Sequence, residues 1–424
     1  MSRSTLPTRH ALSSLSRQIQ AFYGKDTFAG LGPSLMRKKP TFRVIFAIVR
    51  QMSKSRLLNI MLVAGVLLNY RVLRLPPTHT GIFQFGMSQN NIKSFDRLNR
   101  CLPQQVRDQI CINGQETPFS RRIATVLSPK LMWDAGCALK ETRQRSELAH
   151  LQAVIGCAAL LLYSRPLPEH LKVICIANDH SPIASALTAV ARQQGRGTCY
   201  TQHAPVTEHF PHLNYDLAVL FDRASKRAYE LAAERSDLEV ATQVVILPPF
   251  EEEFRQPTAS AAPYKVGLCL SYLPDMEGLR ALVRLLSDSP DVSAIQMRRH
   301  PRCRHNWSAF TRINKVDLRP QDELATAFFA NVDMVLTPNS GVTIESMHYG
   351  RPTFYVPGTD TITDDYYGFV AEGLVPVFSK ESLAAPAAFF DEEWKNRFKI
   401  YDETTMSSLP DLRETTGRAF LDLL

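Results

Sequence analysis

The sequence contains no CxxC pair, no apolar run long enough to span a membrane, no internal repeat and no low-complexity tract. The eight cysteines lie mostly within apolar stretches, so we expect small buried thiols in a reducing compartment rather than disulfides. The apolar stretch at residues 57–70 is shorter than the roughly 20 residues of a spanning helix. The first 40 residues lack the apolar core of a signal peptide, which predicts a cytoplasmic protein.

Acidic residues are almost absent from the first 75 residues, where 13 Lys and Arg stand against Asp26 alone. The remainder carries 36 Lys and Arg and 40 Asp and Glu, so the net charge of +8 divides into +12 and −4. Proteins that bind nucleic acid normally carry their positive charge on the folded body, so we expect no nucleic-acid partner. A basic, partly apolar amino terminus instead predicts a protein peripheral to the inner face of the cytoplasmic membrane. Residues 57–70 would then form either an interfacial helix or a buried core helix.

Strand-like and helical stretches alternate along two parts of the chain. A mainly helical region includes a long apolar helix at residues 147–163, and the alternation then runs over residues 171–247 and again over 266–356. This is the rhythm of βαβ units, which build parallel sheets covered by helices on both faces. The sequence therefore predicts an α/β protein with two Rossmann-like domains that face a cleft, preceded by a helical basic extension.

Breaks in this rhythm set the predicted domain boundaries. A stretch rich in Pro, Glu, Ala and Ser is typical of a linker, and the polar, basic first 40 residues are typical of a poorly ordered tail. The predicted segments are the tail (1–40), a first Rossmann-like domain (41–250), a linker (251–263), a second Rossmann-like domain (264–390) and a helical segment that crosses back (391–424).

Two polar strings of the second half each follow a predicted buried strand. RRHPR begins at Arg298, and TPNSGVTIE begins at Thr337 and leads into a helix. Ligands bind at the carboxyl edge of an open parallel sheet, and a helix start offers unpaired N–H groups to phosphate. His300 could donate a hydrogen bond to that phosphate, and Glu345, one turn into the helix, could reach a ribose. The alternative is a basic surface turn, an N-cap at Ser340 and a solvated glutamate.

Polar side chains also follow two predicted strands of the first half. Asp179 and His180 come after one strand, and Gln202 and His203 come after the next. Transfer of a group to a hydroxyl needs a base that removes a proton, and both His and Asp can act as one. We rank His203 first and Asp179 second, although each histidine alone could equally be a capping or core residue.

Three histidines near the end of this region raise the question of zinc. They lack the acid of an HExxH arrangement, so we expect no metal site. The three are His203, His209 and His212.

These strings resemble a known family. HPR, the small-hydroxyl turn that leads into SGVTIE, and GRP resemble the donor domain of GT-B glycosyltransferases. More narrowly, the second half is similar to bacterial capsule and surface-polysaccharide enzymes that use cytidine-activated donors: sialyltransferase-, Kdo-transferase- and glycerophosphotransferase-like proteins. TQHAP resembles their QHG element, with Ala204 in place of the glycine. DMEG resembles the acidic element of bacterial sialyltransferases, with Met276 between the two acids.

The resemblance implies a metal-independent GT-B glycosyltransferase without a bound cofactor. Such an enzyme moves a sugar from a nucleotide-sugar donor, with CMP-linked sugars among the candidates, to a surface polysaccharide or glycolipid acceptor. Asp275 and Glu277 rank below the other catalytic candidates because a capping acid at a helix start explains them. The donor-binding candidates are Arg298, His300, Pro301, Asn339, Ser340, Gly341, Thr343 and Glu345, and the catalytic candidates are His203, Asp179, His180 and His300.

Two other classes of function stay open. The same frame could transfer a polyol phosphate, or hydrolyse or epimerise a nucleotide sugar. The imperfect QHG match also leaves room for a non-catalytic polysaccharide-assembly protein.

Overall fold

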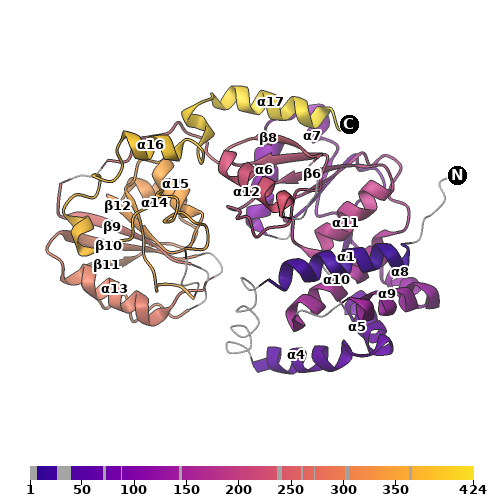
Figure 1. Ribbon diagram of the computed structural model, residues 1–424. Helices are drawn as coiled ribbons and strands as arrows, with labels where there is room; N and C mark the ends of the chain where they lie inside the picture. Colours follow the sequence, from indigo (N-terminus) through magenta and orange to yellow (C-terminus); the bar gives the residue numbers. More distant parts are fainter. Residues whose placement is uncertain are drawn as a thin grey trace.

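Two parallel sheets, one in each half of the chain, form the centre of the computed structural model (Figure 1). Core clusters lie on both faces of each sheet, which confirms the predicted α/β fold with two Rossmann-like domains. Pro301 and half of the predicted tail, residues 1–6 and 26–39, lie outside the residues that the structure describes. Those residues are 7–25, 40–69, 73–86, 88–142, 146–235, 241–258, 261–271, 273–300, 303, 305–361 and 365–424.

The sheet of the first domain has six parallel strands in the order β3-β2-β5-β6-β7-β8. Successive side chains of a strand point to opposite faces, so an apolar run supplies both cores. In β5, Ile174 and Ile176 pack with α10 and α11, whereas Val173 and Cys175 pack with α6 and α17. The strands are β2 (Ile82–Phe85), β3 (Ile110–Ile112), β5 (Val173–Ile176), β6 (Gly197–Thr201), β7 (Leu217–Leu220) and β8 (Gln243–Ile246), beside a small antiparallel ladder of β1 (Arg74–Leu75) and β4 (Gln115–Glu116).

Helices cover both faces of this sheet, and further helices pack on α10 to form an additional helical layer. The long apolar helix α10 covers one face, as its predicted bounds suggested, and α1, α5 and α9 pack on it or on one another. The helices of this part are α1 (Arg9–Tyr23), α4 (Pro40–Met52), α5 (Arg56–Asn69), α6 (Gln89–Asn99), α7 (Gln104–Arg107), α8 (Phe119–Val126), α9 (Pro129–Glu141), α10 (Glu147–Tyr163), α11 (Pro182–Gln193) and α12 (Arg223–Glu234).

The sheet of the second domain has five parallel strands in the order β11-β10-β9-β12-β13. A Cβ atom on Gly267 of the central strand would lie 3.0 Å from Cζ of Phe328, so the glycine lets α14 pack closely on the sheet. The elements are β9 (Tyr264–Cys269), α13 (Met276–Asp288), β10 (Val292–Arg298), β11 (Val316–Leu318), α14 (Ala325–Ala330), β12 (Met334–Thr337), α15 (Val342–His348), β13 (Thr353–Tyr355), η1 (Lys380–Leu383), α16 (Glu392–Phe398), η2 (Glu403–Thr405) and α17 (Leu409–Leu421).

The prediction of a poorly ordered tail over residues 1–40 is wrong for α1. Leu12 is fully buried, and Ile19 packs against α10 at Gly156, where a Cβ atom would lie 2.3 Å from Cδ1 of Ile19. The hydroxyl of Thr8 caps the helix by accepting from the N–H of Ala11 at 3.2 Å. Apolar residues three or four positions apart line the buried face, and this stripe outweighs the basic composition.

The apolar stretch that begins at residue 57 forms most of α5, which is half in the core. Val63 and Leu67 are fully buried, whereas Leu57 and Met61 are 64% and 56% exposed. Buried and surface positions therefore share this helix, and neither of the two alternatives describes it alone. No helix among the described residues has both the length and the apolar character that crossing a bilayer requires.

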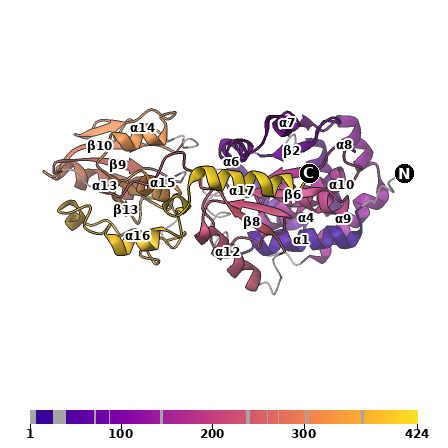
Figure 2. The same ribbon diagram turned by 90° about the horizontal axis from the view of Figure 1, so that it is seen from above.

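The carboxyl-terminal segment returns to the first domain through α17 (Figures 1 and 2). Phe420 is buried in the core beside β7 and β8, and a Cβ atom on Gly417 would lie 2.4 Å from the carbonyl oxygen of Cys101. The preceding helix α16 stays with the second domain, where Trp394 is buried. The chain therefore crosses between the domains a second time before α17.

Candidate active site

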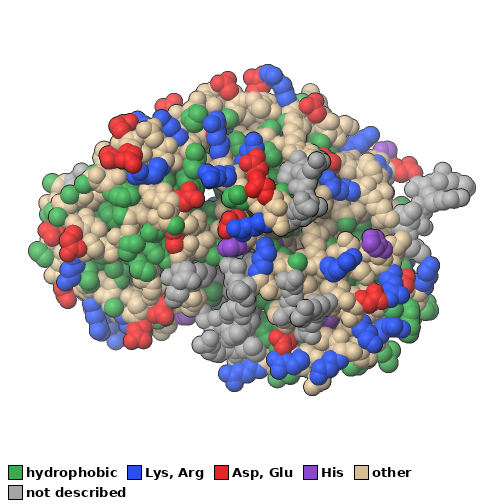
Figure 3. Space-filling model, in the orientation of Figure 1, with side chains coloured by type: hydrophobic (Ala, Val, Ile, Leu, Met, Phe, Trp, Pro, Cys, Tyr) green, Lys and Arg blue, Asp and Glu red, His purple; other side chains and the backbone are tan. Residues whose placement is uncertain are grey.

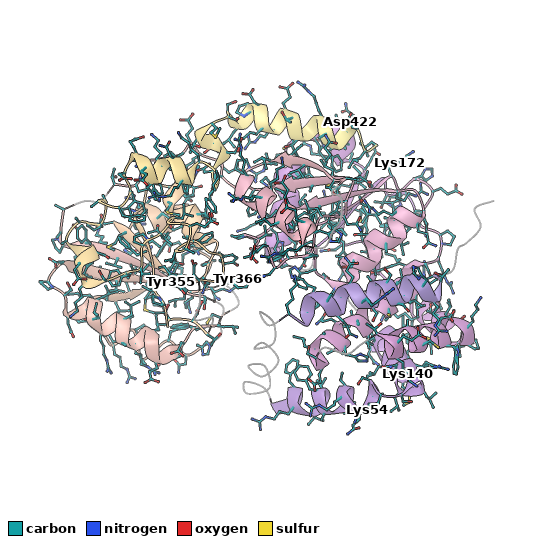
Figure 4. The ribbon with its side chains drawn as sticks, in the orientation of Figure 1. Lys54, Lys140, Lys172, Tyr355, Tyr366 and Asp422 are labelled. Carbon is teal, nitrogen blue, oxygen red and sulfur yellow. The ribbon has the colours of Figure 1, made fainter. Side chains whose placement is uncertain are left out.

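The carboxyl ends of both sheets meet at the junction between the domains. A Cβ atom on Gly341, in the turn after β12, would lie 2.8 Å from Cδ of Pro205, in the loop after β6. The side chain of Tyr366 forms a hydrogen bond with Thr207 of that same loop. Figure 4 shows Tyr366 at the edge of the second domain that faces the first. The strand ends that the sequence singled out in each half therefore face one another.

The turn after β12 is held by its own side chains. Oδ1 of Asn339 accepts from the N–H of Tyr366 at 2.8 Å, and Oγ of Ser340 accepts from the N–H of Val342 at 3.3 Å. Helix α15 begins at Val342, with Gly341 as its N-cap. Thr343 is only 2% exposed, so the structure does not bring its hydroxyl to the surface of the turn. Of the predicted phosphate contacts here, Ser340 and Gly341 remain at the junction.

Charges from both domains surround Glu345. Burial raises the pKa of its carboxyl group, and the positive charges of Arg298 and Lys93 oppose that rise. Arg298 ends β10, and Lys93 lies on α6 of the first domain. Glu345 as a residue is half-buried, and its role at a ribose stays a prediction. Sequence reasoning missed Lys93, which belongs to a helix without any motif.

The loop after β10 carries Arg298 and His300. An Nη atom of Arg298 lies 3.4 Å from the carbonyl oxygen of Glu323, and the carbonyl oxygen of His300 accepts from the N–H of Cys303 at 2.9 Å. Both side chains are half-buried at the carboxyl edge of the sheet. The loop after β10 therefore brings basic side chains to the same carboxyl edge of the sheet as the turn at Ser340.

Asp179 is buried, and each of its carboxylate oxygens has a partner. Its Oδ1 atom lies 3.0 Å from Nδ1 of His180, and its Oδ2 atom accepts from the hydroxyl of Tyr229 at 2.7 Å. Both carboxylate oxygens have partners and the residue is 5% exposed, so Asp179 is placed to hold His180, and its rank as second candidate base stays a prediction. The contact orients the imidazole ring of His180, and in the tautomer in which Nδ1 donates to Asp179 the Nε2 atom is the acceptor nitrogen.

Aromatic rings from two segments, α1 and the loop after β6, surround His180. The ring of Phe22 stacks on it with centroids 5.1 Å apart, and the ring of Phe210 meets it edge-on at 5.4 Å. The hydroxyl of Tyr23 donates to the backbone oxygen of His180 at 3.2 Å. Two of these residues belong to α1, so the segment that was predicted to be a disordered tail forms part of the site.

The QHA turn is rigid because Gln202 is fully buried. Its Nε2 atom donates to the backbone oxygen of Ala204 at 2.9 Å and to Oγ of Ser225 at 2.8 Å, and its Oε1 atom accepts from the N–H of Phe221 at 2.7 Å. His203 follows in the same turn and is half-buried. Its role as base stays a prediction, whereas His180 has an oriented ring.

Two further predictions concern acids and metal. Oδ1 of Asp275 accepts from the N–H groups of Glu277 and Gly278 at 3.0 and 2.9 Å, which confirms that Asp275 caps α13. In the part of the chain that the structure describes, no group of three or more His, Cys, Asp or Glu side chains is placed to hold a metal ion.

Several solved structures are similar to this chain at low identity. The glycotransferase of kitacinnamycin is 11% identical over 82% of this chain and 99% of its own, with a TM-score of 0.49. The calicheamicin glycosyltransferase CalG4 is 15% identical over 81% and 95%, with a TM-score of 0.44. The glycosyltransferase SnogD from Streptomyces nogalater is 11% identical over 81% and 100%, also with a TM-score of 0.44. No family model and no curated protein matches the sequence.

Proposed function

We propose that the protein is a glycosyltransferase that moves a sugar from a nucleotide-activated donor to a hydroxyl group of a surface polysaccharide or glycolipid. One observation carries this proposal: His180 follows β5 and Arg298 ends β10, strands whose carboxyl ends lie on facing sheet edges, and Tyr366 of the second domain bonds to Thr207 of the first. Tyr366 donates its N–H to Asn339 of the donor-side turn. Its side chain meets Thr207, and the charge of Asp179 raises its pKa beyond the effect of burial.

In this mechanism, Nε2 of His180 removes the proton of the acceptor hydroxyl as its oxygen attacks the anomeric carbon of the donor. The bond from that carbon to the phosphate oxygen breaks, and the nucleotide leaves with an additional negative charge. Asp179 stabilises the imidazolium that forms, as the carboxylate does in a hydrolase triad.

The departing phosphate is stabilised from the second domain. Arg298 and His300 supply cationic or hydrogen-bonding groups, and the N–H groups near Ser340 and Gly341 supply dipoles. These groups serve without a metal ion in the proposed mechanism. CMP-linked donors are the first candidates, and the acceptor belongs to a growing surface glycan at the inner face of the cytoplasmic membrane.

The test is a panel of CMP-, CDP-, UDP- and GDP-linked sugars added to the purified full-length chain. We expect one nucleotide to raise the melting temperature, and we expect its sugar to be transferred only when an acceptor glycan is present. Release of free sugar without an acceptor would indicate a hydrolase. The absence of stabilisation by every donor would contradict the proposal and favour a non-catalytic assembly protein.

A further inference from the structure

Helices α4 and α5 present an apolar surface to solvent. Five of the fourteen large hydrophobic side chains that are exposed among the described residues lie within residues 40–69. The most exposed on α4 are Val44 and Ile48, at 62% and 48%. The others are Ile45, Leu57 and Met61. Single exposed apolar residues are ordinary, but a cluster of this kind on two adjoining helices marks an interaction site.

The exposure of this cluster does not reflect a poorly packed helix, because the opposite side of α4 is buried against the domain. Phe46 and Val49 are each 2% exposed, and the helix packs on α10 and α5. Positions 44 and 48 are four residues apart and therefore lie on one side of α4, away from the buried pair. The same side of α4 carries Arg43, Val44, Ala47, Ile48, Gln51 and Met52 in one open patch.

The charged side chains that α4, α5 and the turn between them contribute to the apolar surface are all basic. Residues 40–69 contain no Asp or Glu, whereas Arg43, Arg50, Lys54 and Arg56 fall within them. Arg50 forms an ion pair with Glu147 at 2.6 Å yet keeps 64% of its side chain exposed, and Arg56 lies 4.5 Å over the ring of Trp133. Figure 3 shows Lys and Arg side chains along the lower edge, where α4 lies in Figure 1, and Figure 4 shows Lys54 there.

We infer that the α4–α5 surface docks on an anionic lipid bilayer, with both helices in the plane of the interface. The exposed apolar residues would enter the boundary between head groups and acyl chains, and the flanking cations would contact acidic head groups. An anionic bilayer complements this surface better than a protein does. The charged side chains of residues 40–69 are all positive, and exposed apolar side chains lie among them. The inference rests on the membrane location in the proposed function and is independent of the transfer chemistry.

The test uses the full-length protein and sedimentation with phosphatidylcholine vesicles, with and without phosphatidylglycerol. The wild type should bind the phosphatidylglycerol vesicles and lose binding as salt rises. Val44→Glu combined with Ile48→Glu should weaken binding about tenfold or more, because charges replace inserted apolar groups. Leu324→Glu is the matched control, since Leu324 is 70% exposed on the other domain, and its binding should stay within about twofold.

A second pair tests the charges. Arg43→Gln combined with Lys54→Gln should weaken binding to phosphatidylglycerol vesicles about tenfold, whereas Arg280→Gln combined with Arg284→Gln on α13 should have little effect. The inference is overturned if the double glutamate variant of Val44 and Ile48, or the double glutamine variant of Arg43 and Lys54, binds vesicles as well as the wild type does. A wild-type dimer that Val44→Glu and Ile48→Glu convert to a monomer, with vesicle binding unchanged, also overturns it.

Measuring donor binding distinguishes failure of the membrane inference from failure of the proposed function. The α4 variants should keep the thermal shift that a nucleotide donor produces, because these residues lie outside the candidate active site. Loss of vesicle binding with an intact shift in these variants supports the surface. If the wild type binds vesicles but no nucleotide donor, the proposed transferase function is contradicted and the membrane inference is not.

Discussion

The Nδ1 atom of His180 lies 3.0 Å from Oδ1 of Asp179, and the other carboxylate oxygen is occupied by the hydroxyl of Tyr229. The pair is at the carboxyl end of β5, at the edge of the first sheet that faces the second domain. A histidine held by a buried carboxylate is an oriented base whose other nitrogen is available to a substrate. The contact between Asp179 and His180 is the basis for proposing His180 as the base that accepts the proton.

Replacement of His180 should remove transfer without removing donor binding. His180→Ala should lower kcat by about 10²- to 10⁴-fold, which is the usual contribution of a general base. Asp179→Asn should also lower kcat by about 10²-fold or more, because the wrong tautomer would be favoured. Steady-state kinetics with the donor found by the panel checks both. A His180→Ala enzyme with full activity, together with an inactive His203→Ala enzyme, would assign the base to His203 instead.

Tyr229→Phe distinguishes a positioning role from a catalytic one. The substitution removes hydrogen bonds with buried Asp179 and with the Tyr200 hydroxyl and should lower the free energy of unfolding by about 1–3 kcal/mol. Since Nδ1 of His180 keeps its partner, kcat should fall less than about tenfold. Urea denaturation and kinetics on the same sample measure the two effects. A loss of kcat as large as that of Asp179→Asn would contradict this division of roles.

Gly341 should be sensitive to a single added methyl group. Alanine would place a Cβ atom 2.8 Å from Cδ of Pro205, which is too close and would shift the turn or separate the domains. We expect Gly341→Ala to weaken donor binding about tenfold through this overpacking, and Pro205→Ala in the same chain to restore most of it. Gly65→Ala, which meets nothing within 4 Å, is the control for a glycine substitution as such. If the two substitutions change the free energy of donor binding additively, a direct contact between residues 341 and 205 is contradicted.

The stability of the protein should depend on pH through Asp222. Burial raises the pKa of this carboxyl group to about 7, and Asp402 and Glu403 add to the rise, whereas the N–H of Ser225 opposes it. Between about pH 4 and pH 7 the folded state therefore holds a proton that the unfolded state has released, so this group's contribution to stability falls as pH rises through that window.

Asp222→Asn removes this titration and keeps an oxygen that can cap α12. The free energy of unfolding of the variant relative to wild type should therefore increase between about pH 4 and pH 7, by up to a few kcal/mol. Urea denaturation at several pH values measures the difference. A difference that stays constant with pH would contradict the raised pKa.

Apolar periodicity was enough to predict the sheets and α10, because buried parallel strands are short apolar runs between turn residues. The edge strands β3 and β11, at Ile110–Ile112 and Val316–Leu318, were missed because three half-exposed residues leave little pattern. The stripe of apolar residues in α1 was present in the sequence but was outweighed by its basic composition.

The candidate site was predicted less well than the fold, because its chemistry depends on distant partners. Asp179 was assigned to the acceptor, but Tyr229, fifty residues further along the chain, closes over it. Phe22 reaches His180 across more than 150 positions. Strand ends can be located from sequence, whereas burial of a polar group at a strand end depends on which helix covers it.

The central claim is that one site is built from two facing edges, with donor binding on the second domain and acceptor activation on the first. Titration calorimetry of the nucleotide selected by the donor panel into wild type, Arg298→Gln and His180→Ala tests it most directly. We predict that Arg298→Gln weakens nucleotide binding about tenfold or more, because a charged hydrogen bond to phosphate is lost, and that His180→Ala binds like the wild type. Equal affinity of all three proteins, or no binding by the wild type, would contradict the account.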